Sequence, residues 1–344
     1  MLFIFYNTFS NGDYFMSRSL VKSISEQNKD HQFKIFTNFN SYLFRDIENL
    51  EYMTDPMIPF GHPEKYNLYL FFRQFDKEPY IRLNKDVILI NTCCSGLNAF
   101  IGRNAECDVI ALGEAMKRCL SFIESREKIL LQFNYTLTDL LPSLPSTDIS
   151  SFLEWKKDKS NLVFYYNYLS KTGAKLPIVP KSEHDYDDHD EVVLRLSNTF
   201  PEKTFLLPRV TPALKDRPNI VSCEELFDCP ELPSCENLCK LIRIANLCDV
   251  SIHFDIGACF YYLHSQIFEG TNKIIHVGVT SMYYDLLYKS LLEMGFPKEK
   301  IDSKMIYMQC LTTTELYTNL TNDFSTAPRR HYRYKDTLDS QDHT

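Results

Sequence analysis

The chain has 344 residues and a formal net charge of −8, and 44% of its residues are hydrophobic. An acidic chain lacks the basic face that releases counterions from a nucleic-acid backbone, so we exclude a nucleic-acid binder. The length exceeds the size at which one hydrophobic core stops growing, and we therefore expect two domains.

The cysteines and apolar runs indicate the compartment. The chain has 11 cysteines, an odd number, and no charged-then-apolar signal segment precedes the first apolar run. We expect reduced thiols in a cytoplasmic protein. The apolar runs stop well short of the ~20 residues that a membrane span needs, so we expect no transmembrane segment. Peripheral contact with a membrane and the oligomeric state stay open.

The first stretch predicts the start of an α/β unit. Residues 2–6 form an uninterrupted apolar run, which is typical of a strand buried on both faces of a parallel sheet. From Phe15 onwards apolar residues recur at helical spacing. The polar loop between them, residues 7–13, would lie at the carboxyl edge of the strand, where α/β sheets bind ligands. Asp13 either caps the helix or projects a carboxylate toward a ligand.

The rest of the first half continues the alternation of strand and helix. A buried strand over residues 86–90 is followed by Asn91 and Thr92, small polar side chains at another strand-to-loop edge. This alternation predicts a doubly wound domain over residues 1–140. Residues 141–160 gather prolines, serines and the only tryptophan, and we interpret them as a linker.

The order of elements restarts after the linker, which predicts a second domain over residues 161–324 and a polar tail over 325–344. Its first strand, residues 162–166, is followed by a loop that carries hydroxyl and ammonium groups. Helices are predicted over 192–200, 235–247, 259–268 and 283–294, and strands over 204–207, 220–221, 250–254 and, as the last, 273–279. The expected fold class is α/β, with two Rossmann-like domains facing each other across a cleft.

Two clusters suggest metal sites by residue type alone. One combines imidazoles with carboxylates: His184, Asp185, Asp187, Asp188, His189 and Asp190. Its spacing matches no metal loop, so we favour a solvated acidic loop before the helix. The other comprises Cys223, Cys229, Cys235 and Cys239. It lacks the paired Cys-x-x-Cys spacing of a zinc site, and we interpret it as buried or incidental thiols. Phosphate-loop, dinucleotide and nucleophile-elbow motifs are absent from the sequence, which weakens kinase, dehydrogenase and hydrolase hypotheses.

Four segments of the second half follow one another in a distinctive order: residues 235–239, 248–252, the Asp255-Ile256-Gly257 loop and residues 274–278. Together they resemble the GT-B glycosyltransferases, and within them the heptosyltransferase-like group. In that group a helix leads to a strand, an Asp-x-Gly loop, a second helix and a strand ending in Gly. The segment Asn11-Gly12-Asp13 also resembles the group's Gly-Asp acceptor loop.

The resemblance implies a role for each segment. Asp13 would be the general base that takes the proton from the acceptor hydroxyl. The acceptor side would include Asn11, Gly12, Asn91 and Thr92. The nucleotide-sugar donor would contact Tyr168, Ser170, Thr172, Lys175, Glu225, Asp255, Ile256, Gly257 and Gly278. The family's basic residue maps best to Lys175 and next to Lys171, and the family's His after the Asp-x-Gly loop is replaced here by Phe260.

We therefore hypothesise a glycosyltransferase that moves a sugar from a nucleotide-sugar donor to a glycan or other hydroxyl acceptor, with no metal or other cofactor. Two alternatives stay open. One is a GT-B-shaped nucleotide-sugar epimerase. The other is a non-catalytic scaffold that binds a glycan or a partner, for which 21 Tyr and 25 Phe offer faces that stack on sugars.

Overall fold

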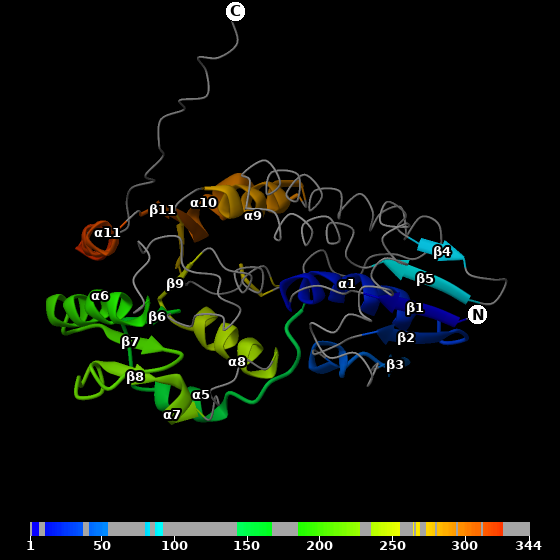
Figure 1. Ribbon diagram of the computed structural model, residues 1–344, viewed down its shortest axis with the longest axis horizontal. Helices are drawn as coiled ribbons and strands as arrows, with labels where there is room; N and C mark the ends of the chain where they lie inside the picture. The colour runs from blue at the N-terminus through cyan, green and yellow to red at the C-terminus, as the bar shows by residue number, and fades with distance from the viewer. Residues whose placement is uncertain are drawn as a thin grey trace, which may run out of the picture.

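The computed structural model of the chain contains two α/β units joined by a connection that passes beside α1 (Figure 1). The structure describes residues 2–6, 11–36, 41–53, 80–82, 87–91, 143–166, 185–227, 235–254, 264, 266–268, 273–278, 281–293, 295–310 and 312–325.

The N-terminal unit is a five-stranded sheet in the order β3-β2-β1-β5-β4. Its elements are β1 (Leu2–Tyr6), α1 (Asn11–Gln27), β2 (Gln32–Phe36), the 3-10 helix η1 (Ser41–Phe44), β3 (Leu50–Met53), β4 (Tyr80–Arg82) and β5 (Val87–Asn91). β1 pairs in parallel with β2 and with β5, and β4 pairs antiparallel with β5. β1 forms as predicted, and Phe3 and Phe5, which lie on one face of the sheet, are at most 1% exposed.

The C-terminal unit is a six-stranded sheet in the order β11-β10-β9-β6-β7-β8, and its strand pairs are parallel. Its strands are β6 (Leu162–Tyr165), β7 (Thr204–Leu207), β8 (Ile220–Ser222), β9 (Val250–Phe254), β10 (Lys273–Gly278) and β11 (Met305–Gln309). Its helices are α5 (Ser150–Lys156), α6 (Asp185–Thr199), α7 (Cys223–Phe227), α8 (Cys235–Asn246), α9 (Met282–Glu293), α10 (Lys298–Lys304) and α11 (Thr313–Ser325). The expectation of two Rossmann-like α/β domains is confirmed.

Helices cover both faces of the C-terminal sheet. Successive side chains of a strand point to opposite faces, so Val163 and Tyr165 of β6 join the apolar cluster under α6 and α11, while Leu162 and Phe164 join the cluster under α8 and α9. Burial on both faces explains the uninterrupted apolar run of β6.

A buried arginine holds the N-terminal unit to the connection between the units, residues 143–149. Arg18 of α1 is 1% exposed, and its guanidinium forms a bidentate pair with Asp46, at 2.8 and 2.6 Å. The guanidinium also donates to the carbonyl oxygens of Ser143, at 2.7 Å, and Leu43. Burial opposes ionisation of Asp46, but the hydrogen bonds and charge of Arg18 outweigh it, so the pKa of the Asp46 carboxyl lies below its usual value.

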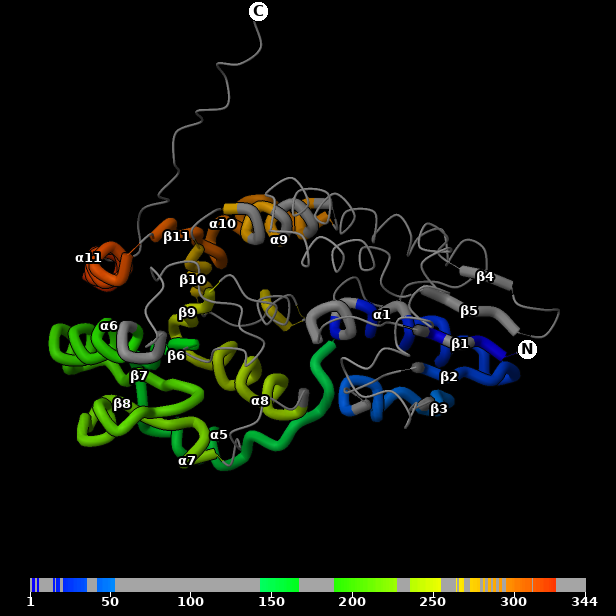
Figure 2. Tube along the Cα trace, in the orientation of Figure 1, coloured from blue at the N-terminus to red at the C-terminus, as the bar shows by residue number. Residues whose placement is uncertain are grey.

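The connection is held from both sides. From the N-terminal unit, the Tyr42 hydroxyl donates to the carbonyl of Ser146 at 3.1 Å. From the C-terminal unit, Arg243 of α8 donates to the carbonyl of Thr147 at 3.2 Å. The thick tube of this connection lies between α1 and α5 in Figure 2. Its course therefore depends on both units.

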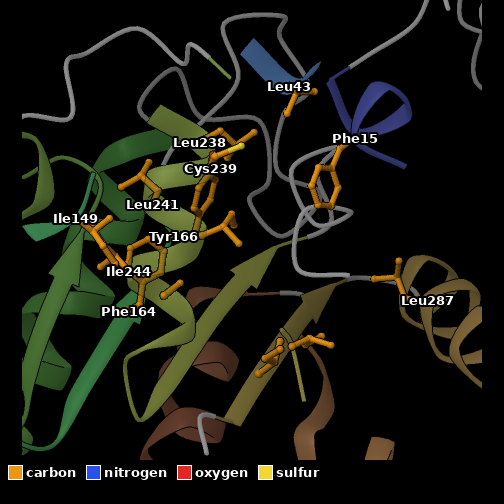
Figure 3. Packing of buried hydrophobic residues seen from close by; sticks show 14 of the residues in the cluster. Phe15, Leu43, Ile149, Phe164, Tyr166, Leu238, Cys239, Leu241, Ile244 and Leu287 are labelled. Atoms are coloured by element: carbon orange, nitrogen blue, oxygen red, sulfur yellow. The ribbon is translucent and has the colours of Figure 1, made fainter. Parts of the chain in front are cut away.

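The two units also share one hydrophobic cluster. It includes Phe15 of α1 and Leu43 of η1 from the N-terminal unit, and Phe164, Leu238 and Cys239 from the C-terminal unit. Figure 3 shows Leu43 near the end of α8 that carries Leu238 and Cys239, where η1 packs on α8. An exposed ion pair between Arg45 and Glu236, at 3.9 Å, lies at the same contact and contributes little.

The structure corrects several boundaries expected from the sequence. α1 begins at Asn11, so the predicted loop 7–13 ends in helix. α6 begins at Asp185, so residues 185–190 are helical and do not form the expected solvated loop. Acidic residues favour a helix N-terminus because they complement its dipole, which explains both corrections. In addition, β11 follows the strand expected to be last, and residues 266–268 form a turn where a helix was expected.

The stretch interpreted as a linker, residues 141–160, contains α5. Phe152 of α5 packs edge-on against Phe227 of α7, with ring centroids 5.3 Å apart, so this helix belongs to the C-terminal unit. The exact domain boundaries stay predictions.

We expect Asp46→Ala to lower the free energy of unfolding by about 2–3 kcal/mol, because it leaves the buried Arg18 charge without a carboxylate. The loss stays below that of a fully buried pair because Asp46 is 38% exposed. Urea denaturation measures it. The matched control is Glu51→Ala, which removes the partner of Lys34 at 3.0 Å in an exposed pair and should cost less than about 1 kcal/mol. Equal losses in the two variants would contradict a special role for Arg18.

Candidate functional site

The N-terminal sheet brings its predicted acceptor-side segments to one edge. β1 lies between β2 and β5, and the strand order reverses there, which is where open α/β sheets bind ligands. Asn91, the last residue of β5, is in register with Tyr6, the last residue of β1. Asn11, Gly12 and Asp13 form the start of the helix that follows β1. Thr92 lies outside the described residues.

The position of Asp13 bears on the two hypotheses for it. Asp13 is the third residue of α1, whereas the N-cap position immediately precedes Asn11. An acid in the first turn complements the helix dipole, and both hypotheses for Asp13 stay predictions.

The C-terminal sheet has an equivalent reversal between β6 and β9. β6 pairs with β7 on one side and β9 on the other, and the Tyr166 N–H donates to the Ile252 carbonyl at 2.9 Å. The two main donor segments follow these neighbouring strands in the sequence. Their predicted residues lie outside the described part of the chain: Tyr168, Ser170, Thr172, Lys175, Asp255, Ile256 and Gly257.

The structure describes the other two predicted donor residues. Glu225 lies in α7, where its N–H donates to Ser222 Oγ at 3.2 Å in an N-cap bond, and its carboxylate forms an exposed ion pair with Lys215 at 3.7 Å. α7 follows the edge strand β8, so Glu225 lies apart from the β6–β9 reversal. Gly278 ends β10, and its carbonyl accepts from the Tyr307 hydroxyl at 3.2 Å.

Three ring side chains that the sequence analysis did not assign to the site pack together at the carboxyl ends of β6 and β9. The hydroxyl of Tyr165, the last residue of β6, shares a 2.7 Å hydrogen bond with Nδ1 of His189 in the early turns of α6. Phe254, the last residue of β9, packs edge-on against both, with ring centroids 4.8 Å from His189 and 5.5 Å from Tyr165. These residues pack together at the carboxyl ends of β6 and β9, next to the predicted donor segments.

Burial keeps this group uncharged. His189 is 1% exposed, and burial lowers the pKa of its imidazole to about 4, so the ring is neutral at pH 7. Burial also raises the pKa of the Tyr165 hydroxyl well above its usual value, with Cys310 and Asp190 adding to the shift. In the same turn of α6, Asp190 accepts a hydrogen bond from the Thr211 hydroxyl.

The two clusters that suggested metal sites by residue type alone can be compared with the described side chains. His189 and Asp190 of the acidic cluster bond to Tyr165 and Thr211. Within the described ranges, no group of three His, Cys, Asp or Glu side chains could hold a metal ion. Cys223 and Cys239 are buried and form no disulfide, in agreement with their interpretation.

The sequence did contain a signal that His189 lies on the buried face of a helix. His189, Val192, Val193 and Leu196 follow the i, i+3, i+4, i+7 spacing of one helix face, and all four are at most 2% exposed. The charges around His189 masked this pattern and suggested a solvated loop. No sequence pattern singled out Tyr165, because a tyrosine in a buried strand is an ordinary core residue.

The two units and their strand-order reversals define a protein with two Rossmann-like α/β domains. A scan against protein-family models finds no match, and a search of curated proteins finds none. In contrast, solved structures of glycosyltransferases do match.

The chain is similar to E. coli heptosyltransferase WaaC with ADP-2-deoxy-2-fluoro heptose, at 11% identity and a TM-score of 0.45, over 94% of this chain and 100% of that chain. It is also similar to WaaG, a glycosyltransferase involved in lipopolysaccharide biosynthesis, at 12% identity and a TM-score of 0.41, over 95% and 91%. Anabaena Alr3699/HepE in complex with UDP and glucose matches at 11% identity and a TM-score of 0.38, over 94% and 89%. These similarities concern the path of the chain and assign no role to any residue.

Among the helices in the described part of the chain, none is long and apolar enough to cross a membrane.

We expect the free energy of unfolding to fall as the pH is lowered from 6.5 to about 4. In this window the unfolded chain protonates His189, whose ordinary pKa is 6.5, while the folded chain, with a pKa of about 4, does not. The stabilisation is complete above pH 6.5 and is lost as the pH falls toward 4.

His189→Asn should make this decline shallower by at most about 3 kcal/mol across the window, as urea denaturation at a series of pH values measures. Some decline should remain, because burial also lowers the pKa of His253 and of His264. Identical pH dependence in the variant and the wild type would show that His189 is not buried in its neutral form.

Proposed function

We propose that this protein is a glycosyltransferase that moves a sugar from a nucleotide-sugar donor to a hydroxyl acceptor. The observation that carries the proposal is the placement of the predicted segments. Asn11–Asp13 and Asn91 lie at the strand-order reversal of the N-terminal sheet, and the two main donor segments follow the strands that flank the reversal in the C-terminal sheet. One edge would take the acceptor and the other the donor.

Glycosyl transfer needs a base for the acceptor hydroxyl. A carboxylate near the acceptor fills this role if it can take the proton as the new bond forms. Asp13 is our candidate because it lies in the first turn of α1, at the edge where β1 and β5 end.

The donor's diphosphate needs positive charge or N–H donors as it departs. A helix N-terminus can supply them, but α6 begins with Asp185, Asp187 and Asp188, whose carboxylates would repel a diphosphate. We therefore assign phosphate binding to Lys175, with Lys171 as the second candidate, and to the Asp-x-Gly segment at Gly257. The same assignment needs no metal ion or other cofactor, since the lysine supplies the charge.

The described donor edge favours transfer over epimerisation. A GT-B-shaped epimerase would need a His and carboxylates that act on the sugar. The His at this edge, His189, is 1% exposed and bonded to Tyr165, so its ring is closed off from a substrate.

We expect nucleoside diphosphates to stabilise the protein, and Lys175→Ala to weaken their binding by about 1.5–3 kcal/mol, the range for a charge-assisted hydrogen bond. A thermal-shift panel identifies the nucleotide, and calorimetric titration gives the dissociation constant. Lys159→Ala is the matched control, because Lys159 is exposed and precedes β6 at the opposite edge of the sheet. Wild-type affinity in Lys175→Ala would move the role to Lys171.

We expect Asp13→Asn to lower the rate of sugar transfer by about a hundredfold to ten-thousandfold, because the amide cannot accept the proton. Donor binding and the melting temperature should change little, since Asn keeps the size of the side chain. The control Asp30→Asn, in the exposed turn after α1, should transfer sugar at the wild-type rate. If Asp13→Asn does so too, the base is a different residue.

A further inference from the structure

Packing alone does not explain the pair of Tyr165 and His189, because a buried imidazole costs more free energy than an apolar side chain in the same place. The imidazole is 1% exposed, and its Nε2 is buried with no hydrogen-bond partner among the described residues. Burying a polar atom without a partner costs free energy that an apolar side chain of similar size would not. Only Nδ1 is bonded, to the Tyr165 hydroxyl, within the described part of the chain. We therefore take this single hydrogen bond as the reason for an imidazole at this position.

The bond joins the end of a strand to the start of the helix that follows it. Tyr165 ends β6, and His189 lies in the early turns of α6. Because both side chains are buried and each is fixed to one element, the 2.7 Å bond sets how far those turns stand from the sheet. Phe254 at the end of β9 packs against both rings and extends the contact to the neighbouring strand.

A second bond fixes the same turn from another direction. Asp190, next in sequence to His189, accepts from the Thr211 hydroxyl, which belongs to the connection between β7 and β8. The start of α6 is thus bonded to β6 and to the connection between β7 and β8. A helix that is held to a sheet only by its apolar face has no such hydrogen bonds. Here the two bonds act at the edge where β6 and β9 end.

We infer that His189 is a positioning residue of the donor site: held by Tyr165, it fixes the start of α6 against the carboxyl ends of β6 and β9, and thereby the geometry in which a nucleoside diphosphate binds. This inference rests on the proposed function, because it takes the β6–β9 edge as the donor edge. Neither ring touches the donor, and both act through the elements they join.

Calorimetric titration with the nucleoside diphosphate selected by the thermal-shift panel tests this inference on the full chain. Tyr165→Phe and His189→Leu remove the bond and should each raise the dissociation constant about tenfold, which corresponds to about 1.4 kcal/mol. His189→Asn keeps an amide near the position of Nδ1 that can bond to Tyr165, so it should bind within about threefold of the wild type. This rescue separates the hydrogen bond from the mere volume of the ring.

The matched control is Tyr284→Phe, which removes a hydroxyl that donates to the Met305 carbonyl at 3.3 Å, at the amino end of β11. It should lower the melting temperature and leave the dissociation constant unchanged. If Tyr165→Phe behaves in the same way, the pair is structural only and the inference is overturned. If no nucleoside diphosphate binds the wild-type protein, the proposed function fails first, and the inference fails with it.

Discussion

The buried guanidinium of Arg18 is the constraint on which the relation between the two units depends. An arginine keeps its charge in a protein interior, so burial demands acceptors for its donors. They come from Leu43, Asp46 and Ser143, which lie 25, 28 and 125 residues away in sequence. All three segments must be in place before the charge is compensated. The guanidinium therefore selects one arrangement of α1 and the connection, whatever its net contribution to stability.

Both sheets place acidic residues at the start of the helix next to the strand-order reversal. Asp13 lies in the first turn of α1, and α6 begins with Asp185, Asp187 and Asp188. Acidic residues at these positions favour helix formation, because they complement the positive end of the helix dipole. Under the proposed function, a carboxylate near the carboxyl end of β1 would receive the proton, and lysine would meet the charge of the phosphate near the carboxyl ends of β6 and β9.

The sequence predicted β1, β5 and β6 because each contains an uninterrupted apolar run, and it predicted β9 and β10 although Ser251, His253 and His276 interrupt theirs. It did not single out β11, an edge strand in which Met305 and Met308 are buried while Ile306 and Tyr307 are partly buried. Charge misled the prediction at residues 185–190, where a helix start was taken for a loop. The Tyr165–His189 bond could not be predicted, because it depends on how far α6 stands from the sheet. The sequence placed the predicted site segments after β1, β5, β6 and β9 through the order of strands and loops, and it gave no sign of the Tyr165–His189–Phe254 group at the ends of β6 and β9.

The shared hydrophobic cluster has a consequence for how the chain reaches its fold. Phe5 and Phe15 are made early in synthesis, but the cluster they join also includes Phe164 and Leu238, which leave the ribosome much later. Contacts between residues so far apart in sequence are slow to form, and exposed apolar strands aggregate while they wait. The cluster thus couples the folding of the two halves in spite of their separate sheets. Expressed alone, either half would leave its part of this cluster uncovered.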